Sequence, residues 1–94
     1  MTEQQICRGL IDQYGRVHQI VKAVEEQGEL IRALAKWLNG APDWENLVTE
    51  LVDVEITLEQ LRMMLTDIVG TAAIEEKKAE LLLRLEAMIR RELD

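Results

Sequence analysis

The 94-residue sequence predicts an all-α protein, and two patterns indicate this class. Apolar residues recur at spacings of three and four along the chain, and no stretch alternates apolar and polar residues as a strand does. Turn-forming residues are few: Gly15, the run Asn39-Gly40-Ala41-Pro42, and Gly70. They divide the chain into four helical segments, which we expect to form one bundle-like domain over residues 1–94.

The first two helices are expected over about residues 2–14 and 16–38. Gly15 lies between them, where a glycine in the left-handed conformation would end the first helix. The third helix should begin after Asp43, a favourable N-cap that follows Pro42, and continue to about Val69. Thr71 is a possible N-cap for the fourth helix.

Composition excludes several classes of protein. With 48% hydrophobic and 31% charged residues, the chain is too apolar to be disordered and too often interrupted by charge to span a membrane. A net charge of −7 has the wrong sign for binding a nucleic acid backbone. The N-terminus lacks a basic stretch followed by an apolar one, so we expect a cytoplasmic protein. The single cysteine, Cys7, has apolar neighbours at helical spacing and is expected to pack in the core.

Acidic residues form an i, i+3 pair on each of the two central helices. Glu26 and Glu29 share one side of the second helix, and Glu50 and Asp53 share one side of the third. Both pairs border apolar arcs that we expect to face the core. On the second helix this arc contains Ala23, Leu30, Leu34 and Trp37; on the third it contains Leu47, Leu51, Val54, Leu58, Leu61 and Leu65. Two antiparallel helices joined by a short turn would bring the four carboxylates together.

Carboxylates that converge at the edge of a core raise one another's pKa unless a cation neutralises them. A ligand set of oxygen atoms alone favours Mg²⁺, or Mn²⁺ in its place, over zinc. Lys22 and Lys36 lie along the acidic line of the second helix, where they could contact a phosphate or pair with the acids. Asn46 precedes Glu50 by one turn and could contact a ligand. Ordinary surface charge is the alternative explanation of the acids.

The runs Glu25-Glu26-Gln27-Gly28-Glu29 and Glu50-Leu51-Val52-Asp53 resemble the EExxE and ExxD motifs of the MazG-like all-α nucleoside triphosphate pyrophosphohydrolases. The resemblance covers residues 14–64. It implies a Mg²⁺-dependent enzyme that cleaves a nucleotide between its α and β phosphates, releasing a nucleoside monophosphate and pyrophosphate.

The resemblance also implies roles for individual residues. Glu26, Glu29, Glu50 and Asp53 would be the metal ligands, Glu25 would orient or deprotonate the attacking water, and Lys36 would contact a phosphate. The chain departs from the family at two places. Thr49 stands where many members have Glu, and Leu81 where many have a Lys three residues before an Arg; Lys77 or Lys78 could replace that lysine.

A second apolar arc on the third helix, containing Val48, Val52, Ile56 and Met63, predicts contact with another subunit, because a helix that is apolar on two sides must be covered on both. This expectation fits the dimers and tetramers of the family that the chain resembles. The aromatic residues Trp37, Trp44 and Tyr14 could stack on a nucleotide base. The core is the favoured place for Trp37, however, and Trp44 could equally pack across the Pro42 turn. His18 is expected either at the surface or against substrate.

Two other functions are alternatives to a pyrophosphohydrolase. A non-enzymatic helical interaction module, with acids that only improve solubility, would show no response to divalent cations. A carboxylate-bridged di-iron bundle needs Glu-x-x-His pairs, whereas the only histidine, His18, has no such spacing.

Overall fold

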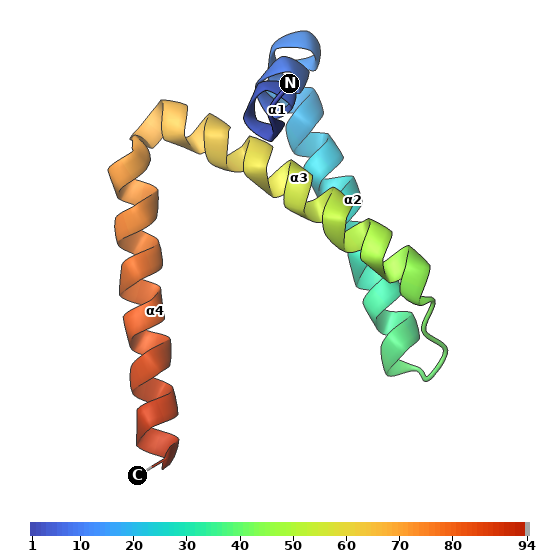
Figure 1. Ribbon diagram of the computed structural model, residues 1–94, viewed down its shortest axis with the longest axis vertical. Coiled ribbons are helices and arrows are strands. Elements are labelled where there is room, and N and C mark those ends of the chain that lie inside the picture. The colour runs from blue at the N-terminus through green and yellow to red at the C-terminus, as the bar shows by residue number, and fades with distance from the viewer. Residues whose placement is uncertain (94) are drawn as a thin grey trace. The chain divides into compact units, whose positions relative to one another are not determined.

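The computed structural model describes residues 1–93 and confirms the all-α class (Figure 1). Its helices are α1 (Glu3–Tyr14), α2 (Arg16–Leu38), α3 (Trp44–Val69) and α4 (Thr71–Leu93). Residues 1–93 contain no strand. The helix boundaries agree with those expected from the sequence to within one or two residues.

Side-chain caps fix the starts of two helices. The Thr2 hydroxyl accepts a hydrogen bond from the Gln5 backbone N–H at 3.1 Å, and the Gln5 side-chain oxygen accepts one from the Thr2 N–H at 2.9 Å. This reciprocal pair is a capping box. At α3, Asp43 Oδ1 accepts from the Asn46 N–H at 3.1 Å, which confirms Asp43 as the N-cap.

Two expected helix ends are wrong in detail. Gly15 has φ 88° and ψ 160°, so it is extended with positive φ and does not adopt the left-handed helical conformation. With this backbone it joins the end of α1 directly to the start of α2. Thr71 is the first residue of α4 rather than its N-cap, because Gly70, with φ 87°, makes the bend immediately before it.

The chain forms two compact units, residues 1–64 and residues from 65 onward. The first unit contains α1, α2 and most of α3, and the second contains the end of α3 and α4. All the residues of the candidate site described below, apart from Lys78, belong to the first unit. The single domain expected from the sequence stays a prediction.

The core of the first unit is small and partly polar. Its buried residues are Cys7, Ile11, Gln19, Ala23, Ala33, Val54, Thr57, Gln60 and Met64. Burial confirms the packed role of Cys7, whose thiol lies 4.0 Å from the Ile56 carbonyl oxygen. Burial, together with the charges of Glu3 and Glu59, raises the pKa of this thiol, so Cys7 has the character of a core residue and not of a nucleophile.

The core-facing side of α3 agrees only in part with the one expected: of the expected arc, Val54 is buried. Leu51, Leu58 and Leu65 are about half exposed, whereas Thr57 and Gln60 are buried. The buried positions fall on the stripe that carries Glu50 and Asp53, because side chains three, four and seven residues apart share one side of a helix. The acids therefore lie on the core-facing side of α3 itself rather than beside it.

Trp37 is about half exposed, so its expected place in the core is wrong. Its ring meets the Trp44 ring edge to face, with centroids 5.0 Å apart and an interplanar angle of 77°. This pair joins the end of α2 to the start of α3 across the Pro42 turn, which is one of the two positions that the sequence left open for Trp44.

The second unit has little core of its own. The described residues of α4 include none that is buried, and two of its acidic side chains pair with basic residues of the same helix. Glu80 pairs with Lys77 at 2.9 Å and with Arg84 at 2.8 Å, and Glu86 pairs with Arg90 at 2.7 Å. Within residues 1–93, no helix is both long and apolar enough to cross a lipid bilayer.

Candidate metal centre

Three of the four expected ligands converge between α2 and α3. Carboxylate oxygens of Glu26, Glu50 and Asp53 all lie within 4.8 Å of one another, and all three residues are half-buried. One comes from α2 and two from α3, which is the grouping that the i, i+3 spacing on antiparallel helices predicts.

Small residues allow the grouping to form. Ala23 and Ala33, on α2 either side of Glu26, are buried, and a short side chain lets neighbouring helices approach closely. On α3, Asp53 is followed by the buried Val54 and Thr57. Buried neighbours on both helices thus place the acids in the packed part of the unit, although their like charges repel one another.

Glu50 is the least compensated of the three acids. Its Oε2 atom is buried and has no hydrogen-bond partner. Burial raises the pKa of Glu50, and the negative charges of Glu29, Asp53 and Glu26 raise it further, while Arg32 opposes the shift. A buried carboxylate oxygen without a partner is costly to keep charged, so this atom is suited to accept a cation.

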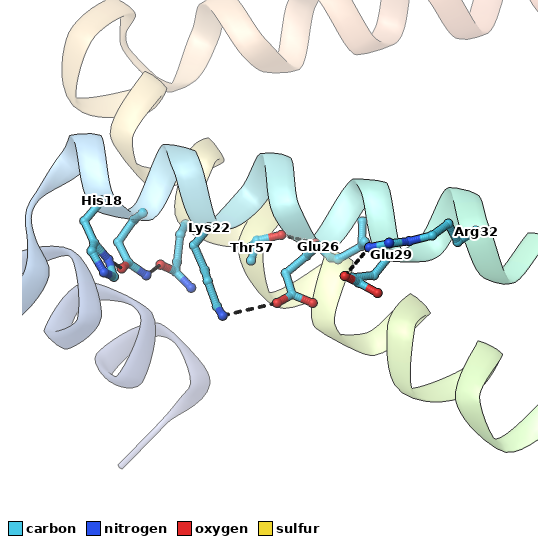
Figure 2. Close-up of polar contacts among 9 residues, drawn as sticks. His18, Lys22, Glu26, Glu29, Arg32 and Thr57 are labelled. Carbon is cyan, nitrogen blue, oxygen red and sulfur yellow. Dashed lines mark hydrogen bonds and ion pairs between the residues drawn. The ribbon is translucent and has the colours of Figure 1, made fainter.

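Glu26 has one cationic neighbour. Figure 2 shows Lys22 reaching toward it along α2, and Lys22 Nζ lies 3.4 Å from a Glu26 carboxylate oxygen. The Glu26 side chain is 15% exposed and that of Lys22 is 51% exposed, so the ammonium group remains open to solvent and to a ligand. The position of Lys22 thus allows both roles that the sequence left open, pairing with the acids and contact with a phosphate.

Glu29 lies outside the three-carboxylate group. It pairs with Arg32 one turn later on the exposed side of α2 (Figure 2). Its charge still contributes to the raised pKa of Glu50, so it lies within electrostatic reach of the site. Its role as a metal ligand stays a prediction.

The other expected site residues lie around or beyond this group. Glu25 is exposed on α2 and contributes no oxygen to the group. Lys36 is in the last turn of α2, ten residues from Glu26 and so about 15 Å along the helix axis. Asn46 is half-buried in the first turn of α3. Lys78 is on α4 in the second unit. Their contacts with a ligand stay predictions.

A cavity of about 400 Å³ opens beside the acids. Its walls come from all three helices of the first unit and are formed by Leu10, Tyr14, His18, Gln19, Lys22, Glu26, Asp53, Ile56, Thr57 and Gln60. The sequence did not identify Thr57 and Gln60 as part of a binding site. They follow Asp53 at i+4 and i+7, so both lie on the acidic stripe of α3, but the stripe alone gives neither of them a role.

Two buried glutamine side chains form a hydrogen bond in the wall of the cavity. Gln19 Nε2 donates to Gln60 Oε1 at 2.6 Å, and His18 Nδ1 lies 2.7 Å from Gln19 Oε1, which makes that nitrogen the donor. The His18 ring stacks on Tyr14 with centroids 5.1 Å apart. The Thr57 hydroxyl donates to the Val54 carbonyl at 2.9 Å.

Searches of protein families, of curated proteins and of solved structures found no match to this chain. The donor set of the site consists of carboxylate oxygens, which suit Mg²⁺ or Mn²⁺ and fit zinc, copper or an iron–sulfur cluster poorly.

Proposed function

We propose that the chain is a Mg²⁺-dependent nucleoside triphosphate pyrophosphohydrolase of the MazG-like kind. The observation that carries the proposal is the meeting of Glu26, Glu50 and Asp53 within 4.8 Å beside a cavity. The buried oxygen of Glu50 that has no partner fits the same proposal, because a cation would complete its coordination.

Different residues of the chain would have different roles in the reaction. Glu26, Glu50 and Asp53 would hold the metal, and Lys22, one turn from Glu26, would contact a phosphate. Bound Mg²⁺ would neutralise phosphate charge and lower the pKa of a water molecule. Glu25, Lys36, Asn46 and Lys78 keep the roles that the sequence suggests: Glu25 as the group that orients water, and the other three as contacts to substrate.

Product analysis tests the activity. We expect purified protein with Mg²⁺ to release pyrophosphate and the nucleoside monophosphate from at least one member of a panel of NTPs and dNTPs. Pyrophosphate and phosphate should be measured separately, because release of phosphate alone would show cleavage at the terminal phosphate. No turnover of any nucleotide with either Mg²⁺ or Mn²⁺ would refute the proposal.

We further propose a homodimer or homotetramer. Val48 and Val52 are exposed, and α4 exposes several large apolar residues over its length. Uncovered apolar surface of this kind is typical of a subunit interface. Light scattering should therefore give a mass above 10.8 kDa for the wild type. Val52→Glu should lower that mass, and a wild type that is monomeric at high micromolar concentration would contradict the proposal.

The exposed apolar residues of α4 also favour a second candidate, a non-enzymatic helical interaction module. In that case the acids would only provide surface charge. The two functions differ in their response to metal, because a module of this kind should gain no thermal stability from Mg²⁺.

A further inference from the structure

The cavity of the first unit has two ends of different chemistry. Glu26, Asp53 and Lys22 line one end, which suits a cation and a phosphate. The stacked rings of Tyr14 and His18 lie toward the other end. A ligand that fills the whole cavity would therefore carry anionic groups at one end and a flat, polar-edged ring at the other.

The Gln19–Gln60 pair belongs to the end with the stacked rings, since Gln19 follows His18 in the chain and accepts its hydrogen bond. Gln19 precedes Glu26 by seven residues, and Gln60 follows Asp53 by seven, so each amide is about 10 Å along its helix from the acids. The two helices thus place the amide pair at matching distances from the acidic end. A sugar would bridge this interval in a nucleotide whose phosphates reach the acids.

Both amides are buried deeply enough for their hydrogen bonds to matter. Gln19 is 4% exposed and Gln60 is 2% exposed, yet both line the cavity. Of their polar groups, Gln19 Oε1 accepts from His18, and one Gln19 N–H is donated to Gln60 Oε1. Beyond these two bonds the pair retains one N–H on Gln19, two on Gln60 and one lone pair on each oxygen. Because Gln60 Oε1 already accepts from Gln19, the group of Gln60 left for a ligand is its N–H₂, a donor.

We propose that the end of the cavity with the Tyr14–His18 stack binds the base of the nucleotide. There, Gln60 with Gln19 selects bases carrying a keto oxygen over bases carrying an amino group. The inference rests on the proposed function and adds the class of base to it. Uracil, thymine and guanine present a keto oxygen where cytosine and adenine present an N–H₂ donor. Donors of the amide pair would bond the former and face the donors of the latter.

Apolar contacts complete the base site. Leu10 of α1 and Ile56 of α3 line the same cavity, and the Tyr14–His18 stack supplies an aromatic surface at its edge. Apolar and aromatic walls hold a ring without distinguishing one base from another, whereas a few polar groups fix its identity. Base selection should therefore depend on the amides much more than on the rings.

The test compares nucleotides that differ at one exocyclic group. For the wild type with Mg²⁺, kcat/KM for pyrophosphate release should be at least about 10-fold higher with dUTP than with dCTP, and higher with dGTP than with dATP, since groups left without a hydrogen-bond partner are strongly disfavoured. Gln60→Met keeps the side-chain length but removes the donors, and should bring the dUTP to dCTP ratio close to one. Gln60→Glu replaces donors with acceptors and should shift the ratio toward dCTP.

Gln27→Met is the matched control, because Gln27 is an exposed glutamine on α2 that does not line the cavity. It should keep the wild-type ratio. Binding of α,β-imido dUTP and α,β-imido dCTP with Mg²⁺, measured by calorimetry, gives the same comparison without turnover. Helicity and melting temperature of each variant show whether it is folded.

The outcomes separate the two proposals. Equal turnover of dUTP and dCTP by the wild type, or a preference that both Gln60 variants retain, would overturn the base assignment and leave the pyrophosphohydrolase intact. Failure to cleave or bind any of the nucleotides would overturn both.

Discussion

The acids of the α2–α3 site and those of α4 are the same residue types in opposite settings. On α4, Glu80 and Glu86 are exposed and pair with basic residues three or four positions away. Between α2 and α3, Glu50 is half-buried, has no cationic partner for its Oε2 atom, and faces other carboxylates.

The difference teaches how to separate surface charge from a site in an acidic helical protein. Exposed pairs of the α4 kind are stable without any ligand and contribute little to folding. A half-buried group of like charges is unfavourable by itself and becomes favourable when a cation arrives. Substitutions in the two groups of acids should therefore have different effects.

The largest expected effect is on turnover. Asp53→Asn removes one charge from the three-carboxylate group while keeping the side-chain shape, and should lower kcat/KM by about 100-fold or more, the scale on which a single electrostatic group contributes to catalysis. Steady-state pyrophosphate release measures it, with Glu86→Gln on α4 as the control that should match the wild type. Equal activities of the two variants would remove the distinction between the groups.

The next effect is on metal-linked stability. Mg²⁺ or Mn²⁺ should raise the melting temperature of the wild type, and at 100 times the dissociation constant the gain would be about 2.7 kcal/mol. Scanning calorimetry with metal and with a chelator measures it. Glu50→Gln should lose most of the response because it lacks one ligand charge, whereas Glu86→Gln should keep it. A wild type that melts at the same temperature in both conditions would contradict the prediction.

The third effect is on the pH dependence of the metal-free protein. Folding raises the pKa of Glu50 above its ordinary value of 4.5, so the folded state holds this proton more tightly than the unfolded state does. The contribution of Glu50 to stability is fully present below pH 4.5 and is lost as the pH rises through the folded pKa.

At pH 7 with a chelator, Glu50→Gln should therefore melt above the wild type, and the difference should shrink as the pH falls toward 4. Melting curves over this pH range provide the measurement. A Glu50→Gln variant less stable than the wild type at pH 7 would show that the charged form of Glu50 stabilises the metal-free fold.

The smallest effect is expected on α4. Glu86→Gln breaks an exposed i, i+4 pair with Arg90, and its effect on the free energy of unfolding should stay within about 0.5 kcal/mol. Chemical denaturation can measure a change of this size. A loss above about 1 kcal/mol would mean that this pair is buried against something in solution.

Much of the fold could be predicted from local sequence. Helix limits depend on caps and glycines that lie next to them, so Asp43 as an N-cap and the extent of α2 agreed closely with the structure. The rotation of α3 about its own axis was harder, because this helix is apolar on more than one side. Leu51 and Leu58 were expected inside, yet Thr57 and Gln60 occupy the buried positions.

The candidate site also divides into a part set by local spacing and a part set by packing. Spacing placed Glu26, Glu29, Glu50 and Asp53 together, because their positions follow from helix geometry and a short turn. The structure groups three of them, and Glu29 lies outside the group. The Gln19–Gln60 pair joins residues far apart in sequence, and its partners could be identified only after the packing of α2 against α3 was known. Trp37 was missed similarly, since its contact with Trp44 depends on the path of the turn.

Direct titration of Mn²⁺ tests the central claim, that the carboxylates of Glu26, Glu50 and Asp53 form a divalent-cation site. Electron paramagnetic resonance of free Mn²⁺ should show saturable binding to the wild type, competed by Mg²⁺, weakened strongly in Asp53→Asn and unchanged in Glu86→Gln. If the wild type leaves the free Mn²⁺ signal unaltered, or if Asp53→Asn binds as the wild type does, the three carboxylates are not a metal site.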